Sequence, residues 1–309
     1  MRIVSYNVRY FSHALRGIGS TRGTQRRIAG RLSSLDELPA LMCLQEVETA
    51  SLRSNVVNRR RTPGETQLEA FMAEIEAALA ATGRESPYEA FYFRAHTYKL
   101  RSVNVYTTGL AILVDRDRFS VDSHNVEAPE HITHHHVALA KDRKQTRICA
   151  HMRLVDSEGR GLHVFNCHLS LPTPFTRTFW RSGPRMGWGP NQLQEARTLV
   201  SFIERQANGE PFVLCGDFNA SPGSPVYRYL VEERGFCSAQ ATLGQHDGET
   251  PHAFATAGFM HLRMHLDHFF SRGLDWADLD GTRQFGDRES SFHGLSDHVP
   301  LIGRIRLQA

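Results

Sequence analysis

Residues 211–220 read Pro-Phe-Val-Leu-Cys-Gly-Asp-Phe-Asn-Ala, and this segment is the strongest local indication of structure in the chain. The apolar run from Phe212 to Cys215 predicts a strand that is buried on both faces. We expect Gly216 to end this strand, because a residue without Cβ turns at little steric cost. Asp217 and Asn219 then follow at the carboxyl end of the strand, where sheet-containing enzymes place their chemistry. An Asx-rich turn that merely caps the strand is the structural alternative.

Similar apolar runs recur along the 309 residues and predict further strands. These runs cover residues 2–8, 39–44, 88–93, 109–114, 148–155, 162–169, 266–270 and 301–307. Segments with helical spacing lie between them, at residues 24–35, 65–81, 191–206 and 226–233. Strands and helices therefore interleave from end to end. We expect one domain over residues 1–309, in which β-sheets pack together and helices flank them.

The composition is typical of a soluble globular protein with a mildly basic charge. Hydrophobic residues make up 40% of the chain, and the net charge of +3 is compatible with a polyanionic substrate. No apolar run approaches the roughly 20 residues that cross a bilayer, and Met1 leads into a strand-like run without a secretory leader. The five cysteines have no paired spacing, which predicts free thiols in a reducing compartment. We therefore expect a cytoplasmic protein.

Polar residues of the kinds used in catalysis lie in or beside several of the apolar runs. They are Asn7, Glu46, His168, Asp217, Asn219, Asp267, Asp297 and His298. A glutamate so close to the apolar run Leu-Met-Cys-Leu, as at position 46, needs a counter-charge when it is buried. Each residue alone could simply form a turn or a cap. Eight carboxylates, amides and imidazoles together are out of place in a core and predict one polar site.

Six short motifs contain these residues. They are Ser-Tyr-Asn at 5–7, Leu-Gln-Glu-Val at 44–47, Asn-Cys-His-Leu at 166–169, Gly-Asp-Phe-Asn at 216–219, Leu-Asp-His at 266–268 and Ser-Asp-His-Val-Pro at 296–300. Through this ordered set the chain resembles the endonuclease/exonuclease/phosphatase superfamily, which has the deoxyribonuclease I-like fold. The resemblance implies an α/β (α+β) four-layered sandwich, two mixed β-sheets packed face to face and flanked by helices. It also implies divalent-metal-dependent hydrolysis of a phosphate ester.

The resemblance assigns the metal and the base to five of these residues. Glu46 would bind Mg²⁺ or Mn²⁺ with the help of Asn7 and Asp297, and hard oxygen ligands suit these ions. His298 would act as the general base or as an electrostatic partner, oriented by Asp267. A carboxylate beside a histidine fixes its tautomer and stabilises its cationic form.

The remaining motif residues would act on the phosphate. Asp217 and Asn219 would position the attacking water and the scissile phosphate. His168 would hydrogen-bond a phosphate oxygen or protonate the leaving group. A phosphodiester is anionic and repels nucleophiles, so its hydrolysis needs a cation, a base and donors for the developing charge.

Departures from the motifs of individual branches narrow the activity. His168 weighs against an abasic-site endonuclease, and the motif at 216–219 lacks the Trp usual in inositol-polyphosphate 5-phosphatases. In the deoxyribonuclease I branch a Glu supports the counterpart of His168, and Glu89 is the candidate here. His268 stands where many relatives carry Tyr, and we assign it no role.

The substrate class stays open at the level of the sequence. We favour phosphodiester over phosphomonoester hydrolysis, and nucleic acid over lipid as the substrate, on mild basicity and family frequency. The alternative is a phospholipid or sphingomyelin-type phosphodiesterase, or a phosphatase, of the same superfamily. A catalytically inactive binding module is a third possibility, but no motif position is substituted. No protein partner is predicted.

Two further segments carry suggestive side chains. Residues 171–190 follow His168 directly and contain Arg177, Trp180, Arg181 and Trp188. Aromatic rings stack on bases and arginines hold phosphates, so this loop is a candidate substrate contact, although its aromatics could simply pack it down. The run His134–His136 is a weak metal candidate, because three consecutive residues of a strand point different ways.

Overall fold

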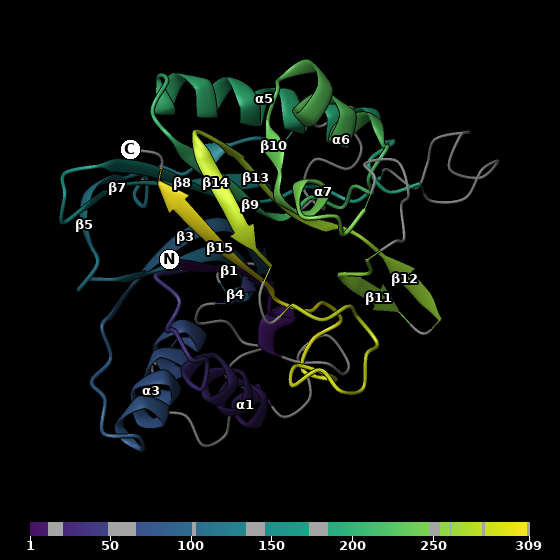
Figure 1. Cartoon of the computed structure of the whole chain (residues 1–309). Coiled ribbons are helices and arrows are strands. Elements are labelled where there is room, and N and C mark those ends of the chain that lie inside the picture. The colour runs from purple at the N-terminus through teal and green to yellow at the C-terminus, as the bar shows by residue number, and fades with distance from the viewer. Residues whose placement is uncertain are drawn as a thin grey trace.

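The structure is a computed structural model that describes residues 1–11, 21–48, 66–100, 103–133, 146–172, 185–246, 254–259, 261–279 and 282–307. Two large mixed β-sheets pack face to face, and helices cover their outer faces (Figure 1). The α/β sandwich predicted from the motifs is therefore confirmed.

The first sheet has six strands. Their order is β14 (Leu274–Asp278), β15 (Leu301–Leu307), β1 (Arg2–Asn7), β2 (Leu41–Val47), β4 (Val103–Asp115) and β3 (Tyr88–Leu100). Strands β1 and β2 are parallel, and the other neighbours are antiparallel. Helices α1 (Thr21–Ser33) and α3 (Gln67–Ala80) lie on the outer face of this sheet (Figure 1).

The second sheet has seven strands. They are β10 (Cys237–Ser238), β13 (Asp267–Arg272), β9 (Phe212–Asp217), β8 (Gly161–His168), β7 (Ile148–Asp156) and β5 (Phe119–His124), with β6 (Glu130–His131) pairing β7. Strands β8 and β9 are the parallel pair. Helices α5 (Pro190–Ala207) and α6 (Pro225–Arg228) cover this sheet, and α6 continues into a π-helical turn, Tyr229–Glu233. Helix α7 (Ala239–Thr242) follows β10, and β11 (Ala257–Phe259) with β12 (Leu262–Met264) forms a separate hairpin.

Three clusters of buried apolar side chains fill the interfaces between the four layers. Val164 and Val213 of the second sheet pack between the sheets against Ile3 and Cys43 of the first. A second cluster lies between the second sheet and α5, and a third between the first sheet and helices α1 and α3. Both faces of each sheet are thus covered by apolar packing, which explains the unbroken apolar runs of the sequence.

Helix α3 shows how local sequence sets an element's start. Thr66 accepts a hydrogen bond from the backbone of Glu69, and the Glu69 side chain accepts one from the backbone of Thr66. This capping box satisfies two N–H groups that the first turn leaves unpaired. Phe71 and Ile75 are then buried on the face that meets the sheet, as the helical spacing predicts.

Gly216 does not end β9, and the expectation that it would is wrong. The strand continues through Gly216 to Asp217. Gly216 has φ 145°, and a Cβ at this position would lie 1.9 Å from the carbonyl oxygen of Cys167 in β8. The glycine therefore permits close approach of the parallel neighbour, which keeps Asp217 paired with His168 at the strand ends.

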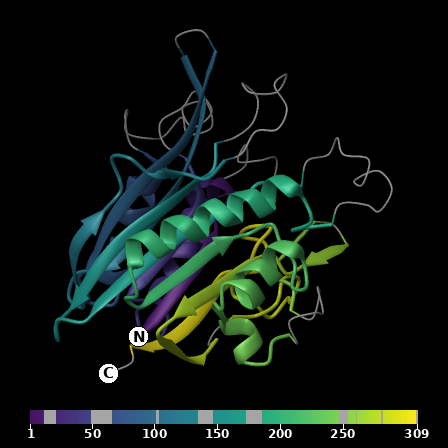
Figure 2. The same ribbon diagram turned by 90° about the horizontal axis from the view of Figure 1, so that it is seen from above.

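The hairpin of β3 and β4 is longer than the apolar runs at 88–93 and 109–114 indicate. The two strands pair from Tyr88 with Asp115 to Leu100 with Val103. Gly109 pairs with Val47 at the end of β2, so the outer half of the hairpin extends past that sheet edge, as Figure 2 shows. Polar residues in this half interrupt the apolar runs from which the strands were predicted.

The prediction of free thiols is confirmed. All five cysteines are free, and Cys43, Cys149, Cys167 and Cys215 are buried.

Candidate active site

Strand ends of the second sheet bring three of the predicted residues into register. The last residues of the parallel strands β8 and β9, His168 and Asp217, are direct neighbours. Strand β13 runs antiparallel to β9, so its first residue, Asp267, pairs with Asp217 as well. Topology alone therefore places these three side chains at one edge.

The first sheet brings its residues to the same edge. Strand β1 ends at Asn7, which pairs with Gln45 of the parallel strand β2, one residue before Glu46. Strand β15 begins opposite the end of β1, where Leu301 pairs with Ser5. The segment just before β15, which holds Asp297 and His298, therefore lies at this edge too.

Hydrogen bonds join the two sheets across the site. The Nδ2 of Asn7 donates to Oδ2 of Asp217 over 3.0 Å and lies 3.5 Å from Oε1 of Glu46. One step deeper, Nε2 of Gln45 donates to Oδ1 of Asn166 over 2.8 Å. Neither Gln45 nor Asn166 is exposed. Gln45 belongs to the motif of Glu46, and Asn166 belongs to the motif of His168. Their buried hydrogen bond supports the site, a role that the motifs alone did not indicate.

Asp267 and His298 form a close pair. The Nδ1 of His298 lies 2.8 Å from Oδ2 of Asp267, and its Nε2 lies 3.7 Å from Oδ2 of Asp217. The hydroxyl of Thr256 accepts from the backbone N–H of Asp267 and so fixes its place. Burial alone would lower the pKa of His298, but Asp267, Asp217 and Asp297 together raise it to about 10. The imidazole is therefore cationic among these carboxylates.

Glu46 occupies a distorted position in β2. Its φ is 55°, and the register of β2 against β4 shifts between Leu44 and Val47. A β-bulge of this kind re-aims a side chain next to a functional site. Burial raises the pKa of Glu46, and the nearby Asp297 raises it further. The positive charge near Glu46 therefore does not offset the burial of its carboxylate.

Asp297 is paired with a residue that the sequence did not point to. Its Oδ2 lies 2.9 Å from NH1 of Arg9. Arg9, Tyr10 and Phe11 follow β1 as a turn (η1, Arg9–Phe11) with φ values of 42°, 57° and 53°. Three consecutive left-handed non-glycine residues are costly, and this turn directs Arg9 to the site.

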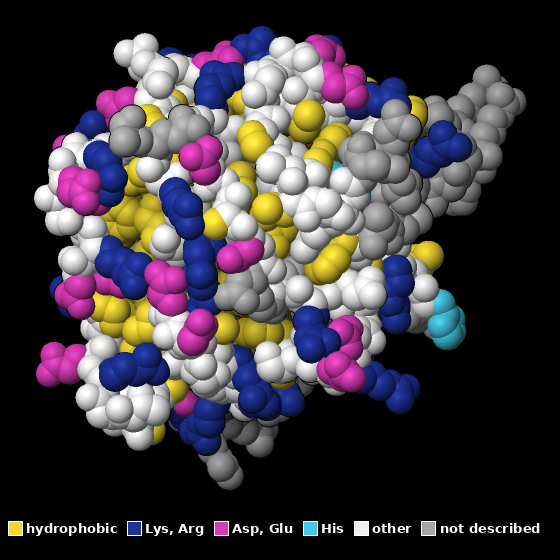
Figure 3. Space-filling view, in the orientation of Figure 1, with side chains coloured by type: hydrophobic (Ala, Val, Ile, Leu, Met, Phe, Trp, Pro, Cys, Tyr) yellow, Lys and Arg dark blue, Asp and Glu magenta, His cyan; other side chains and the backbone are white. Residues whose placement is uncertain are grey.

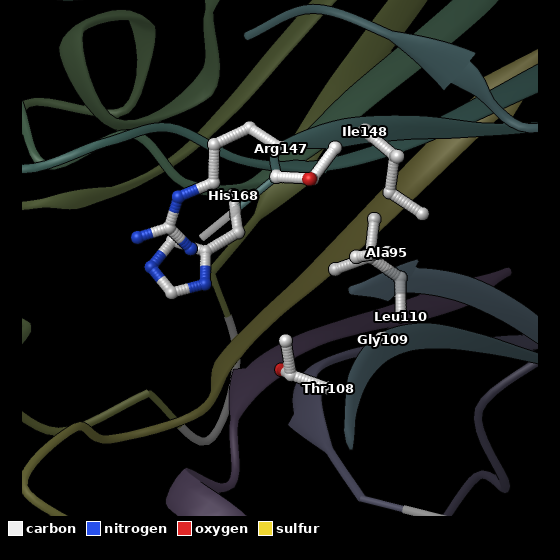
Figure 4. A pocket seen from close by; sticks show the side chains of 8 residues that line it. Ala95, Thr108, Gly109, Leu110, Arg147, Ile148 and His168 are labelled. Atoms are coloured by element: carbon white, nitrogen blue, oxygen red, sulfur yellow. The ribbon is translucent and has the colours of Figure 1, made fainter. Parts of the chain in front are cut away.

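His168 lies on the other side of Asp217. Its Nε2 is 3.4 Å from Oδ2 of Asp217 and 4.0 Å from Oε1 of Glu46. Burial lowers the pKa of His168 well below its usual range, with Arg147 and His298 lowering it further, so the ring is neutral. Arg147 and His168 together line a small pocket with Thr108 and Gly109 of β4 (Figure 4). Arg147 also carried no sequence signal.

The expectation that Glu89 supports His168 is wrong. Glu89 is exposed on the surface and pairs with Val114, which in turn pairs with Leu41 at the start of β2. That is the end of the sheet opposite to Glu46. The residues of β3 and β4 that line the pocket beside His168 are instead Ala95, Thr108, Gly109 and Leu110.

Asn219 is held against the chain that follows His168. Its backbone N–H donates to Oδ1 of Asp217, and its Nδ2 donates to the carbonyl of Leu169 over 2.9 Å. Asn219 has φ 47°, so the turn after β9 is left-handed at this residue. The Asx turn proposed as the structural alternative exists, and it also orients Asp217.

Only part of the predicted loop 171–190 belongs to the described residues. Arg177, Trp180 and Arg181 lie outside the described residues, as does His134–His136. Trp188 is 49% exposed, and the guanidinium of Arg185 stacks 5.4 Å from its ring centroid. Trp188 is thus available at the surface.

With this geometry in place, comparison with known proteins identifies the family. The sequence profile of the Endonuclease/Exonuclease/phosphatase family matches residues 4–298. The chain belongs to this family. Its members are hydrolases of phosphate esters that generally use a divalent metal, so this chain is a phosphoesterase by family.

Individual relatives are distant. Nocturnin from Drosophila melanogaster is 28% identical over 123 residues, which is 40% of this chain and only 16% of that protein. The human Nocturnin catalytic domain has a TM-score of 0.63 at 19% identity, covering 100% of this chain and 93% of that one. A Bacteroides thetaiotaomicron mannosyl-6-phosphatase has 0.62 at 16%, covering 99% and 100%. ANGEL2, a 2',3'-cyclic phosphatase, has 0.60 at 19%, covering 100% and 95%. At these identities the solved structures show a shared fold.

Proposed function

We propose that this phosphoesterase hydrolyses phosphodiesters with the help of a divalent cation. The main support for this proposal is that Oδ2 of Asp217 lies between two imidazoles, 3.7 Å from Nε2 of His298 and 3.4 Å from Nε2 of His168. A displacement at phosphorus needs a proton acceptor on the side of attack and a donor on the side of departure. In this site Asp217 would be the acceptor, and the imidazoles on either side of it would supply N–H donors for the developing charge.

The donor set of the site fits a hard divalent cation. Glu46, Asp217, Asp267 and Asp297 bring four carboxylates together, and burial raises the pKa of both Glu46 and Asp217. Oxygen ligands of this kind suit Mg²⁺ or Mn²⁺. Glu46 and Asp297 would hold the ion. The Oδ1 of Asn7, its only ligating atom, accepts from the N–H of Arg9, so Asn7 would contribute after its amide rotates.

Each remaining group has a task that its position supports. A bound divalent cation would neutralise phosphate charge and polarise a phosphoryl oxygen. The cationic His298, held by Asp267, would serve as the electrostatic partner for the developing charge. Asp217 would orient the attacking water and accept its proton, with Asn219 fixing the carboxylate. His168 would hydrogen-bond the phosphate or assist the leaving group.

Two arginines complete the proposal for phosphate binding. Arg9 pairs with Asp297, and Arg147 lies beside His168, so they approach the carboxylate cluster from two sides. The planar guanidinium fork matches phosphate oxygens. Together with Trp188, and with Arg177, Trp180 and Arg181 outside the described residues, they are the candidates for substrate contact.

Nucleic acid is the favoured substrate class, with lipid as the alternative. The net charge of +3 supports a polyanion only weakly. On the face shown in Figure 3, Lys and Arg side chains are interspersed with Asp and Glu side chains. No described helix is both long and apolar enough to cross a membrane.

A substrate panel tests this proposal directly. The purified chain is assayed with Mg²⁺, Mn²⁺ or Ca²⁺ on plasmid, single-stranded DNA, RNA, sphingomyelin, a phosphoinositide and bis-p-nitrophenyl phosphate. A sugar phosphate and a 2',3'-cyclic nucleotide are included because two structural neighbours are named for such substrates. Metal-dependent cleavage of diesters, lost in His298→Ala, supports the proposal. Turnover of monoesters alone would overturn the diester assignment, and metal binding without any turnover would favour the binding module.

A further inference from the structure

A second group of potential ligands lies behind the active site. His246, His265 and His268 are all buried, and one ring nitrogen of each lies within 4.8 Å of the others. The ring centroids of His246 and His265 are 4.8 Å apart, and those of His265 and His268 are 4.7 Å apart. His265 and His268 are 0% exposed. Three buried imidazoles with converging nitrogens are the donor set of a histidine metal site.

The tautomer of His268 is fixed by its surroundings. Its Nε2 lies 2.8 Å from the carbonyl oxygen of Ala220, which can only accept, so Nε2 carries the proton. Nδ1 therefore holds a lone pair, and this buried atom has no hydrogen-bond partner. Metal-bound histidines commonly donate their other ring N–H to a backbone carbonyl in this way.

His265 has the same unmet need in a stronger form. Neither of its ring nitrogens has a hydrogen-bond partner of normal geometry among the described residues. Burial lowers the pKa of His265 well below its usual range, and the neighbouring His268 and His246 lower it further. The backbone of Phe254 raises this pKa, but its effect is smaller. The ring is therefore neutral with a free lone pair. Leaving such a group buried and unpaired destabilises the fold.

Stacking of the rings is the competing explanation. Tyr227 lies 5.6 Å from His246 and 5.5 Å from His268, and Phe218 packs edge-on against His268 at 5.7 Å, all measured between ring centroids. These contacts account for an aromatic cluster. They do not account for histidine at positions 265 and 268, where a phenylalanine would stack without a buried lone pair.

We propose that His246, His265 and His268 bind a divalent transition-metal ion such as Zn²⁺, separate from the cation of the carboxylate cluster. Imidazole nitrogens favour Zn²⁺, Cu²⁺ or Ni²⁺ over Mg²⁺, whereas the carboxylates around Glu46 favour Mg²⁺ or Mn²⁺. Successive residues of a strand point to opposite faces. The ion on His268 therefore lies on the far face of β13 from Asp267.

The location gives this ion a structural role. His265 and His268 belong to the chain entering β13, and His246 follows α7, so the ion ties two separate segments together. One of them carries Asp267 to His298. Binding in the folded state alone stabilises that state, and the anchoring of β13 makes the three histidines positioning residues for Asp267.

Metal titration of the full chain tests the site. Protein stripped with a chelator is titrated with Co²⁺ and with Zn²⁺, in the wild type and in a Glu46→Gln background that disables the carboxylate site. We expect a tightly bound equivalent in both, with the strong visible absorption of four-coordinate Co²⁺. Zn²⁺ at about 100 times its Kd should raise Tm by several degrees, and Mg²⁺ should not replace it.

Matched variants assign the ligands. His265→Gln and His246→Gln should each weaken Zn²⁺ binding by more than the roughly 10–100-fold that loss of an outer partner costs. His151→Gln, which removes a buried histidine of β7, should bind as the wild type does. If His265→Gln fails to fold, His246→Gln at the edge of the cluster carries the comparison. Wild-type protein without the Co²⁺ band, or equal Zn²⁺ affinity in the variants, would overturn the site and leave an aromatic cluster.

Discussion

Asn7 donates its Nδ2 hydrogen bond to Oδ2 of Asp217 over 3.0 Å, and the two residues belong to different sheets. The contact is buried, and the Gln45–Asn166 bond repeats it one step deeper. The distance between the carboxylates is therefore set by how the sheets pack, and the packed core between them holds the geometry before substrate arrives. Preorganisation of this kind is what an electrostatic mechanism requires.

Glu46→Gln should separate metal binding from stability. The change removes a hard anionic ligand, so Mg²⁺ affinity measured by calorimetry should fall by at least about tenfold, and activity with it. Burial and Asp297 raise the pKa of Glu46, which means that the anion is costly in the metal-free protein. We therefore expect the metal-free Tm of the variant to equal or exceed that of the wild type. Unchanged Mg²⁺ affinity would remove Glu46 from the ligand set.

His298→Ala should reduce kcat by more than the roughly 10²–10⁴-fold that loss of an acid–base group costs. The extra loss is expected because the imidazolium faces three carboxylates and also supplies positive charge. Asp267→Asn should reproduce a large part of the effect, since the 2.8 Å contact to Nδ1 orients the ring. Steady-state kinetics of both variants on the same phosphodiester measure these two losses in kcat. A nearly silent Asp267→Asn beside an inactive His298→Ala would show that the two do not act as a pair.

Arg147→Met should raise KM for a phosphodiester about tenfold or more. A hydrogen bond to a charged group contributes about 1.5–3 kcal/mol, and Arg147 lies beside His168 in the pocket of Figure 4. Arg147→Lys keeps the charge without the planar fork, so it should recover only part of the affinity. Arg205→Met, which breaks an exposed ion pair with Glu130, is the control. Equal KM values for Arg147→Met and this control would place Arg147 outside the phosphate site.

Acid should destabilise the fold through His151. Its Nε2 lies 2.8 Å from Nδ1 of His163, whose Nε2 lies 3.2 Å from Oε2 of Glu210. Burial, with a smaller effect of His163, lowers the pKa of His151 to about 3. Between pH 6.5 and 3 the unfolded chain therefore binds a proton that the folded chain does not, and stability falls as pH falls. From pH 7 to 5 the loss is about 2 kcal/mol.

Urea denaturation between pH 7 and 5 measures this slope. His151→Gln should make the slope shallower, because Gln does not titrate while the other buried histidines still do. His124→Gln, which changes an exposed histidine of β5, should leave it unchanged. Identical slopes in the wild type and His151→Gln would mean that His151 is protonated in the folded protein.

The limits of sequence reading are clearest at the residues around the motif set. Glu46, His168 and Asp217 stood out because each lies within an apolar run or within two residues of its end, and this local signal coincides with the strand ends. Arg9 is directed to the site by a left-handed turn that contains no glycine. Arg147 lies beside His168 because β7, which follows it, pairs with β8. Neither has a local signature, because both depend on long-range contacts.

Gly216 shows a different limit, since a glycine that turns the chain and a glycine that admits a neighbour look alike in sequence. Gly216→Ala should destabilise the fold by about 3 kcal/mol or more, or prevent folding. The added Cβ would lie 1.9 Å from a backbone oxygen of β8, and the φ of 145° is unfavourable for any side chain. No flexible side chain can yield there, so β8 and β9 must separate.

Gly30→Ala is the matched control for this change. Gly30 lies within α1, and a Cβ there would meet nothing within 4 Å. Alanine should stabilise the helix by about 0.5–1 kcal/mol, because it lowers the backbone entropy of the unfolded chain. Chemical denaturation compares the two variants. Similar unfolding free energies for Gly216→Ala and the wild type would show that the close contact between β8 and β9 is not required, and that the pairing of His168 with Asp217 tolerates a wider strand separation.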